Sequence, residues 1–203
     1  MIPETKNKIF IRASSCYIQM SLVAVILVLN CVSVFAQDKK DAQKVFVQYM
    51  DCVKKSDYAS ASKYILKEDL ENFKNLLVPI FVKLLKTDDD PDVAALTDML
   101  FGKYTKKPES IPPQTFFANF MNFVVATQEG FAEIMEQAEF EIGDIYFNEN
   151  DPNLLIINYK INFTVYMFEE DAFEQLIYTN KKWFLKLKQD PNDFVDLLNQ
   201  LQN

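Results

Sequence analysis

The side chains in this sequence that could move protons are carboxylates and phenols, because the 203-residue chain contains no histidine. Imidazole is the commonest general base near neutral pH, so acid–base chemistry would have to use Asp, Glu or Tyr. The candidates by position are Tyr49, Tyr58, and either Glu141 or Asp144. Such a carboxylate works near neutrality only if burial raises its pKa, whereas tyrosines at helical spacing usually pack with their hydroxyls at the rim. We therefore interpret all four first as structural residues.

The scarcity of arginine, histidine and cysteine also disfavours metal and phosphate chemistry. Arg12 is the only arginine, and the cysteines are Cys16, Cys31 and Cys52. Zinc sites built without histidine need several cysteines. The acidic run "TDDDPD" at 87–92 lacks the ligand spacing and glycine of a calcium loop, and its Asp-Pro step suits the start of a helix. We predict no metal site and no cofactor.

The N-terminal residues have the pattern of a secretory signal peptide. Lys6, Lys8 and Arg12 precede the apolar run "MSLVAVILVL", and the small-residue sequence "VFA" ends at Ala36. We expect residues 1–36 to be a signal peptide and the protein to be exported, either periplasmic or secreted. Two alternatives stay open: a retained anchor, because the apolar run approaches the length of a membrane span, and a cell-envelope lipoprotein with lipid on Cys31.

The mature chain is acidic. Removing Lys6, Lys8, Arg12 and Glu4 with the signal leaves 18 basic and 28 acidic residues, a net charge of −10. Nucleic acid and anionic membranes are therefore poor partners. Cys52 is then the only cysteine, which excludes an internal disulfide, and it lies in a helical pattern that favours an inert, partly buried thiol. Residues 37–203 suffice for a single domain.

The first part of the mature chain has helical periodicity. Apolar residues recur at helical spacing from Ala42 to Val53. Four more helices are predicted: "DYASASKYI" at 57–65, 67–86 with a kink or restart at Pro79, one from Pro91 closed by Gly102, and a long helix from Phe117 to Met135 weakened by Gly130. Helices therefore dominate the sequence as far as residue 137.

The second part changes to the two-residue period of a sheet. One face of a predicted strand carries Leu155, Ile157, Tyr159, Ile161, Phe163, Val165 and Met167, and the other, wetter face carries Asn158, Lys160, Asn162 and Thr164. The strand "FEIGDIYF" precedes it, with a bulge at Gly143. The acidic run "FEEDAFE" at 168–174 is predicted to form the tip of a hairpin. Strands 174–179 and 183–188 follow, joined at "NKK", and a helix begins at Asp190. The predicted fold class is α+β, with N-terminal helices packed on a curved antiparallel β-meander and a C-terminal helix.

Two stretches in this arrangement resemble a known family. "DYASASKYI" follows the first helix, and "EQLIYTNKKWFLKL" at 174–187 is similar to a closing hairpin with a Lys-Trp step. The chain thus resembles the cystatin-like roll of the nuclear transport factor two superfamily, particularly its exported bacterial members of unknown function. The resemblance covers residues 39–62 and 139–188. Residues of about 66–126 depart from the family pattern as a helical insertion, and 190–203 are extra.

Two functions remain open. The first is a non-catalytic binding or interaction module whose apolar interior takes a small apolar ligand or a protein partner, but no nucleic acid, with no stable membrane span after processing. Its predicted pocket residues are Tyr49, Tyr58, Tyr159, Phe163 and Trp183. Trp183 alternates with Leu185 and Leu187, so it is predicted to be part of the buried wall. The second function, implied by the resemblance, is a cofactor-free isomerase or dehydratase that uses a buried carboxylate and a tyrosine. We favour the binding module.

Overall fold

The computed structural model describes residues 38–85, 91–128, 130–163 and 168–187. The chain divides into two units, residues 1–41 and 42–203, and the architecture given below is that of the second. None of the helices in these described ranges is long and apolar enough to cross a membrane. The C-terminal helix expected from residue 190 and the strand residues expected at 164–167 lie outside the described residues.

Four strands form one antiparallel meander. They are β1 (Glu139–Phe147), β2 (Leu154–Phe163), β3 (Phe168–Thr179) and β4 (Lys182–Leu185), and they are hydrogen-bonded in that order. The register of β1 against β2 shifts between Ile142 and Ile145, which confirms the bulge expected at Gly143. Helices followed by this sheet confirm the α+β class and are consistent with the roll that the resemblance implies.

The third strand is longer than its sequence suggested. The prediction that "FEEDAFE" tips a hairpin is wrong, because Phe168 to Glu174 belong to β3 and pair along β2. The acidic residues made this stretch resemble a turn, but the pairing alternates them between the two faces of the sheet. The predicted "NKK" turn is confirmed: Asn180 and Lys181 both have positive φ, as a two-residue hairpin turn requires.

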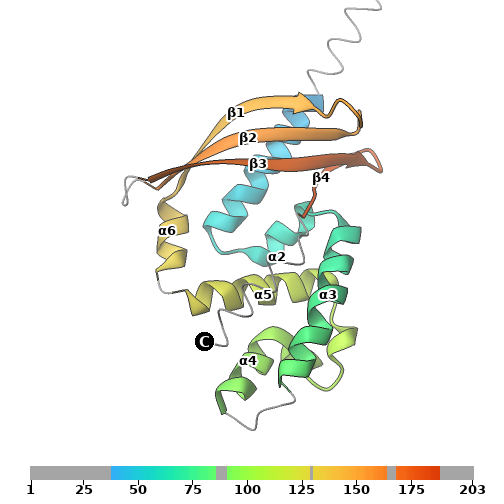
Figure 1. Ribbon diagram of the computed structural model, residues 1–203, viewed down its shortest axis with the longest axis vertical. Helices are drawn as coiled ribbons and strands as arrows, with labels where there is room; N and C mark the ends of the chain where they lie inside the picture. Colours follow the sequence, from blue (N-terminus) through green and yellow to red (C-terminus); the bar gives the residue numbers. More distant parts are fainter. Residues whose placement is uncertain (1–37, 86–90, 129, 164–167, 188–203) are drawn as a thin grey trace, which may run out of the picture. The chain divides into compact units, whose positions relative to one another are not determined.

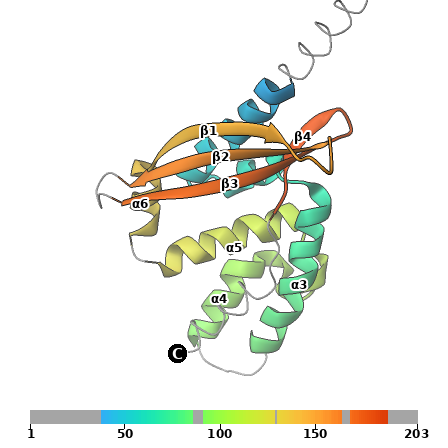
Figure 2. The ribbon, with the colours of Figure 1, turned by 45° about the horizontal axis from the view of Figure 1, so that its top comes forward.

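The first helix crosses one face of the sheet. It spans residues 38–54, and from Ala42 onward its apolar side packs on the strands. Figures 1 and 2 show the part of this helix from Ala42 onward passing behind β1, β2 and β3. The buried residues that hold the two layers together are Ala42, Phe46, Met50, Leu155, Ile157, Tyr159, Leu176, Trp183 and Leu185, the sheet cluster.

The other helices form a second group. They are α2 (Tyr58–Ala61), η1 (Ser62–Tyr64), α3 (Lys67–Leu85), α4 (Pro91–Phe101), η2 (Gly102–Tyr104), η3 (Pro108–Ser110), α5 (Pro113–Thr127) and α6 (Phe131–Gln137). Pro79 lies within α3, so of the two expected alternatives, a kink or a restart, the restart is wrong. The single helix expected from Phe117 to Met135 is also wrong. The structure has α5 and α6 there: Gln128 after α5 has an extended backbone, and Gly130 before α6 has φ +77°, a left-handed conformation that glycine adopts readily.

Phenylalanines dominate the core of this second group. The helical cluster consists of the buried residues Ile65, Leu70, Phe73, Leu77, Val78, Phe81, Leu100, Phe101, Ile111, Phe116, Phe117, Phe120 and Phe123. Phe73 is central, because its ring lies 5.2–6.0 Å from the rings of Phe116, Phe117 and Phe120. Residues 66–126 thus supply most of a core of their own.

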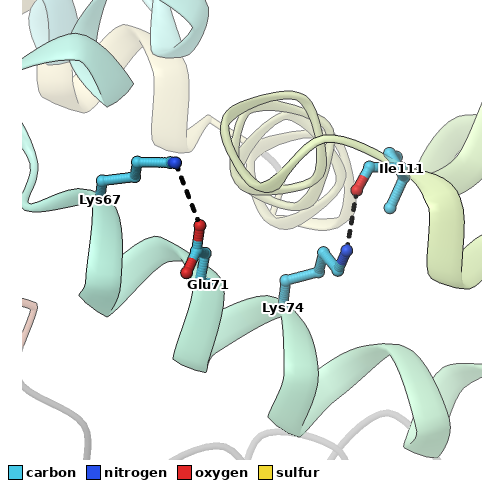
Figure 3. A network of polar contacts seen from close by, with 4 residues as sticks. All are labelled: Lys67, Glu71, Lys74 and Ile111. Atoms are coloured by element: carbon cyan, nitrogen blue, oxygen red, sulfur yellow. Dashed lines mark hydrogen bonds and ion pairs between the residues drawn. The ribbon is translucent and has the colours of Figure 1, made fainter.

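A lysine on α3 anchors the loop that leads into α5. The Lys74 Nζ donates hydrogen bonds to the carbonyl oxygens of Glu109, at 2.9 Å, and Ile111, at 3.1 Å. Figure 3 shows the second of these bonds beside the Lys67–Glu71 ion pair on the same helix. The ion pair is exposed and spans 3.4 Å, so it contributes little to stability. Lys74, by contrast, satisfies two backbone acceptors far away in the sequence.

Candidate functional site

The candidate site lies on the inner face of the sheet, the side that carries Leu155, Ile157 and Tyr159 toward the first helix. Leu155 and Ile157 are fully buried there. Beyond them Tyr159 packs its ring on Phe46 of the helix, with the ring centroids 4.9 Å apart. Phe140 of β1 lies 6.2 Å from Tyr159 on the other side. The wall around the Tyr159 ring is therefore aromatic.

A carboxylate belongs to this inner face. Glu174 of β3 stands directly opposite Ile157, and residues opposite each other in an antiparallel pair share a face. The side chain of Glu174 is half-buried, and its Oε1 accepts a hydrogen bond of 3.5 Å from the Tyr159 hydroxyl. At that length the bond is weak. The next residue of β3 on the same face is Leu176, which is fully buried.

Two phenols share the electrostatic environment of Glu174. Burial raises the pKa of Tyr159 well above its ordinary value of 10.0, and the charge of Glu174 and its hydrogen bond raise it further. Burial likewise raises the pKa of Tyr49, followed by the charge of Glu174 and the neighbouring Tyr159 and Tyr58. Both phenols are therefore neutral hydrogen-bond donors at physiological pH. Glu170 adds a second negative charge that acts on Tyr159.

Tyr58 completes the group of tyrosines. It begins α2, is 2% exposed, and burial raises its pKa, partly offset by a hydrogen bond with the Ser56 side chain. Asp57 sets its position, because the carboxylate accepts a hydrogen bond of 3.0 Å from the backbone N–H of Ser60 and so caps the short helix. Of the predicted residues, Tyr49 thus has Tyr159, Tyr58 and Glu174 as electrostatic neighbours.

The other two predicted pocket residues lie at opposite ends of the inner face. Trp183 pairs with Tyr178, their rings are 5.2 Å apart, and Phe147 is 6.3 Å away. Phe163 ends β2 and stacks on Phe168 at 6.1 Å. At about 3.3 Å per residue, Phe163 is roughly 13 Å along the strand from Tyr159. The structure therefore brings Tyr49 and Tyr159 to Glu174, with Tyr58 beside Tyr49, and places Phe163 and Trp183 toward the two ends of the face.

The carboxylates proposed from the sequence are in the wrong places for acid–base chemistry. Glu141 is exposed and pairs with Lys160 on the side of the sheet away from the first helix, and Asp144 is exposed at the bulge. Both carboxylates are therefore open to solvent. Sequence reasoning missed Glu174, yet a signal existed: counting back in twos from Leu176 places Glu174 and Ala172 on the inner face, provided that the strand begins early enough.

Other reactive groups offer little chemistry. Cys52 is half-buried, and burial followed by the charge of Asp57 raises the pKa of its thiol, which disfavours the reactive thiolate. Across the described ranges, no group of three or more His, Cys, Asp or Glu side chains is placed to hold a metal ion. Among the described residues, the polar groups that act on Tyr159 and Tyr49 are thus chiefly Glu174, with Glu170 and the neighbouring phenols.

Comparisons with known proteins add one similarity. No protein-family model matches the sequence, and no curated protein matches it. The chain is similar to a crystal structure, at 2.00 Å resolution, of a protein from Campylobacter jejuni that is provisionally named an NTF2-like transpeptidase. The two sequences are 19% identical over 50% of this chain and 100% of the other, with a TM-score of 0.29. This similarity is too weak to carry an argument about the site, and the α+β architecture rests on the chain's own elements.

Proposed function

We propose that the protein is an exported, non-catalytic binding module that holds a small ligand against the inner face of its sheet. The ligand that fits is apolar over most of its surface and carries one positively charged group, such as a primary ammonium. The observation that supports this proposal is the half-buried Glu174 carboxylate in line with the fully buried Ile157 and Leu176. The resemblance to exported members of the nuclear transport factor two superfamily agrees with a binding role.

Charge favours a cation over an anion at this position. Glu174 and Glu170 both act on Tyr159, and the phenols of Tyr49 and Tyr159 stay neutral. The local potential is therefore negative, so an anionic ligand would be repelled and a cationic ligand attracted. Low-dielectric surroundings strengthen that preference, because water screens the charge less there than at the open surface.

The aromatic wall favours the same ligand. The ring of Tyr159 lies 4.9 Å from the ring of Phe46 and 6.2 Å from the ring of Phe140. Aromatic faces attract cations and offer apolar contact area to an alkyl chain. A neutral phenol beside Glu174 can also accept a hydrogen bond from an ammonium group. An amphiphilic amine therefore matches the wall and the carboxylate together.

The test is native mass spectrometry of the mature protein with three probes that share one alkyl chain: decylamine, decanol and decanoate. We expect decylamine to bind, decanol to bind more weakly and decanoate not to bind. Glu174→Gln should remove the preference for the amine over the alcohol. The matched control is Glu169→Gln, five residues earlier on the same strand and on the opposite face of the sheet, which should leave that preference unchanged. Failure of all three probes, or equal effects of the two variants, would contradict the proposal.

A cofactor-free enzyme is the second candidate, and the Tyr159–Glu174 pair is the observation that favours it. A carboxylate base beside a neutral phenol donor could transfer a proton next to a carbonyl group. The test separates the two functions: a compound that copurifies with the protein from its native envelope is released, identified and added back. A binding module returns it unchanged, whereas an enzyme converts it and loses that conversion in Glu174→Gln.

Export is tested independently of the ligand. We expect N-terminal sequencing of the protein from its native host to begin at Gln37, because the small-residue end of the apolar run precedes it. A start at Cys31 with attached lipid, or an intact N-terminus, would show that one of the alternatives is correct.

A further inference from the structure

The outer face of the sheet, the side away from the first helix, is unusually apolar over half of its length. Residues opposite in register share a face, so the outer face carries the row Leu154, Ile177 and Phe184 across three strands. The next row holds Tyr146 and Ile156 and continues into the polar Gln175. Tyr146 is 44% exposed, and Phe173, one row further, is 42% exposed. Solvent faces of antiparallel sheets are normally polar, so these six apolar residues, the apolar half, are an anomaly.

The rest of the outer face is acidic. The row of Lys160 has Glu141 on one side and Asp171 on the other, and the row of Asn162 has Glu139 and Glu169. These four carboxylates, the acidic half, surround a single lysine, whose Nζ is 3.8 Å from Glu169. The face thus changes from apolar to acidic along the strands, over roughly 13 Å from the row of Ile156 to the row of Lys160.

The apolar half continues into a groove. Ile177 and Phe184 line a cavity of about 610 Å³ together with Ile65 and Leu66 at the start of α3. The charged side chains of Lys63, Lys67, Glu68 and Glu71 lie around it. Among the described elements, no helix lies over the outer face of β1, β2 and β3 in Figure 1 or in the turned view of Figure 2. Apolar side chains of a partner therefore have both a flat surface and a recess to enter.

We propose that the outer face of the sheet is a docking surface for a segment of another protein that carries large apolar side chains at one end and Lys or Arg at the other. Charge complementarity selects this occupant: its apolar end covers Ile177, Phe184 and Phe173, and its basic end lies against Glu141 and Asp171. A second copy of the chain fits less well, because its own four carboxylates would meet either the acidic half or the apolar half of this face.

The experiment measures binding of a synthetic peptide with leucines in its first half and lysines in its second half to the mature protein, by fluorescence anisotropy. A peptide with glutamates in place of the lysines is the ligand control. We expect the lysine peptide to bind, to weaken with added salt, and to bind better than the glutamate peptide. Neutralising the acidic half with Glu141→Gln and Asp171→Asn should weaken binding at least about fivefold.

A matched pair of substitutions separates this face from the overall negative charge. Glu133→Gln and Glu136→Gln change the net charge equally but lie on α6, and they should alter affinity less than about twofold. Phe173→Ser tests the apolar half, and it should weaken binding as strongly as neutralising the acidic half while circular dichroism stays unchanged. Equal effects of the two charge-neutralised pairs would overturn the proposal. So would a dimer in analytical ultracentrifugation that Phe173→Ser dissociates, because a second copy would then occupy the face.

Discussion

Glu174 places a carboxylate beside Tyr159 and Tyr49 on the face of the sheet that the first helix covers. An acidic residue on a helix-covered sheet face is costly unless it has polar partners or a function. The Tyr159 hydroxyl is one such polar partner, with its oxygen 3.5 Å from the Glu174 Oε1. The pKa of each neighbouring phenol is raised as a result of burial and of this charge. The site is therefore sensitive to alkaline pH.

The first prediction concerns that sensitivity. The pKa values of Tyr49 and Tyr159 are higher in the folded state than in the unfolded state. The stability that these two phenols contribute is therefore fully present below about pH 10 and is lost as the pH rises above it. The loss is about 1.4 kcal/mol per pH unit for each tyrosine. The free energy of unfolding in urea should therefore fall more steeply between pH 9 and pH 11 in the natural protein than in Tyr49→Phe/Tyr159→Phe. Identical slopes would show that the two phenols ionise normally in the folded state.

The second prediction compares the two faces of one strand. Ile157 is fully buried on the inner face, so Ile157→Ala should lower the free energy of unfolding by about 2–5 kcal/mol. Lys160 is exposed and makes only a surface ion pair of 3.8 Å, so Lys160→Ala should change it by less than about 0.5 kcal/mol. Urea unfolding of both variants checks the prediction, and similar losses would mean that the faces of β2 are assigned wrongly.

At the scale of elements, glycines and long-range hydrogen bonds decide where helices end and how loops are held. Between α5 and α6, Gln128 has an extended backbone and Gly130 a left-handed one, so the two helices are not continuous. Gly143 has no such conformation, and a Cβ there would meet the Asn158 carbonyl oxygen at an ordinary 3.5 Å. The backbone conformation therefore favours glycine at position 130 but does not require it at position 143.

The third prediction uses that difference. Gly130→Ala meets no neighbouring atom within 4 Å, so its cost is backbone strain alone, about 1–2 kcal/mol. Gly143→Ala should be tolerated within about 0.5 kcal/mol, because no positive φ is needed. Thermal and urea unfolding of the two variants give the comparison. A larger loss for Gly143→Ala would contradict the assigned role of Gly130.

The fourth prediction concerns the loop before α5. Lys74→Met removes two hydrogen bonds to backbone carbonyl oxygens and should cost about 1–3 kcal/mol. Lys67→Met on the same helix removes only an exposed pair with Glu71 and should cost less than about 0.5 kcal/mol. Hydrogen exchange should show faster exchange around 108–112 in Lys74→Met only. Unchanged exchange there would mean that the loop does not depend on Lys74.

At the scale of the whole folded unit, two clusters are connected by a few specific contacts. Tyr49 packs against both the sheet cluster and the helical cluster. The backbone N–H of Leu66 donates to the carbonyl oxygen of Leu185 at 2.8 Å, and the N–H of Leu187 donates to the Asp69 carboxylate at 3.0 Å. Burial raises the pKa of Asp69, which that hydrogen bond partly offsets. The start of α3 is therefore attached directly to the end of the sheet.

The fifth prediction follows from this attachment: the two clusters should unfold together. Trp183 is the only tryptophan and lies in the sheet cluster, so its fluorescence reports the sheet. Far-ultraviolet circular dichroism reports mainly the helices. The two urea transitions should coincide, as two-state unfolding requires. A fluorescence transition at a separate urea concentration would show that residues 66–126 unfold on their own.

Periodicity in the sequence determined the helices from Ala42, the inward alternation of Leu155, Ile157 and Tyr159, the hairpin at "NKK" and the burial of Trp183, because these depend on local spacing and turn chemistry. Only the tertiary structure decided what depends on pairing across distance. The register of β3 against β2 brought Glu174 beside Tyr159. The same register placed Leu154, Ile177 and Phe184 in one row on the outer face of the sheet. The backbone at Gln128 and Gly130 divided one expected helix into two. A run such as "FEEDAFE" gives no local sign of its partner strand, so its faces are set by the strand it pairs with.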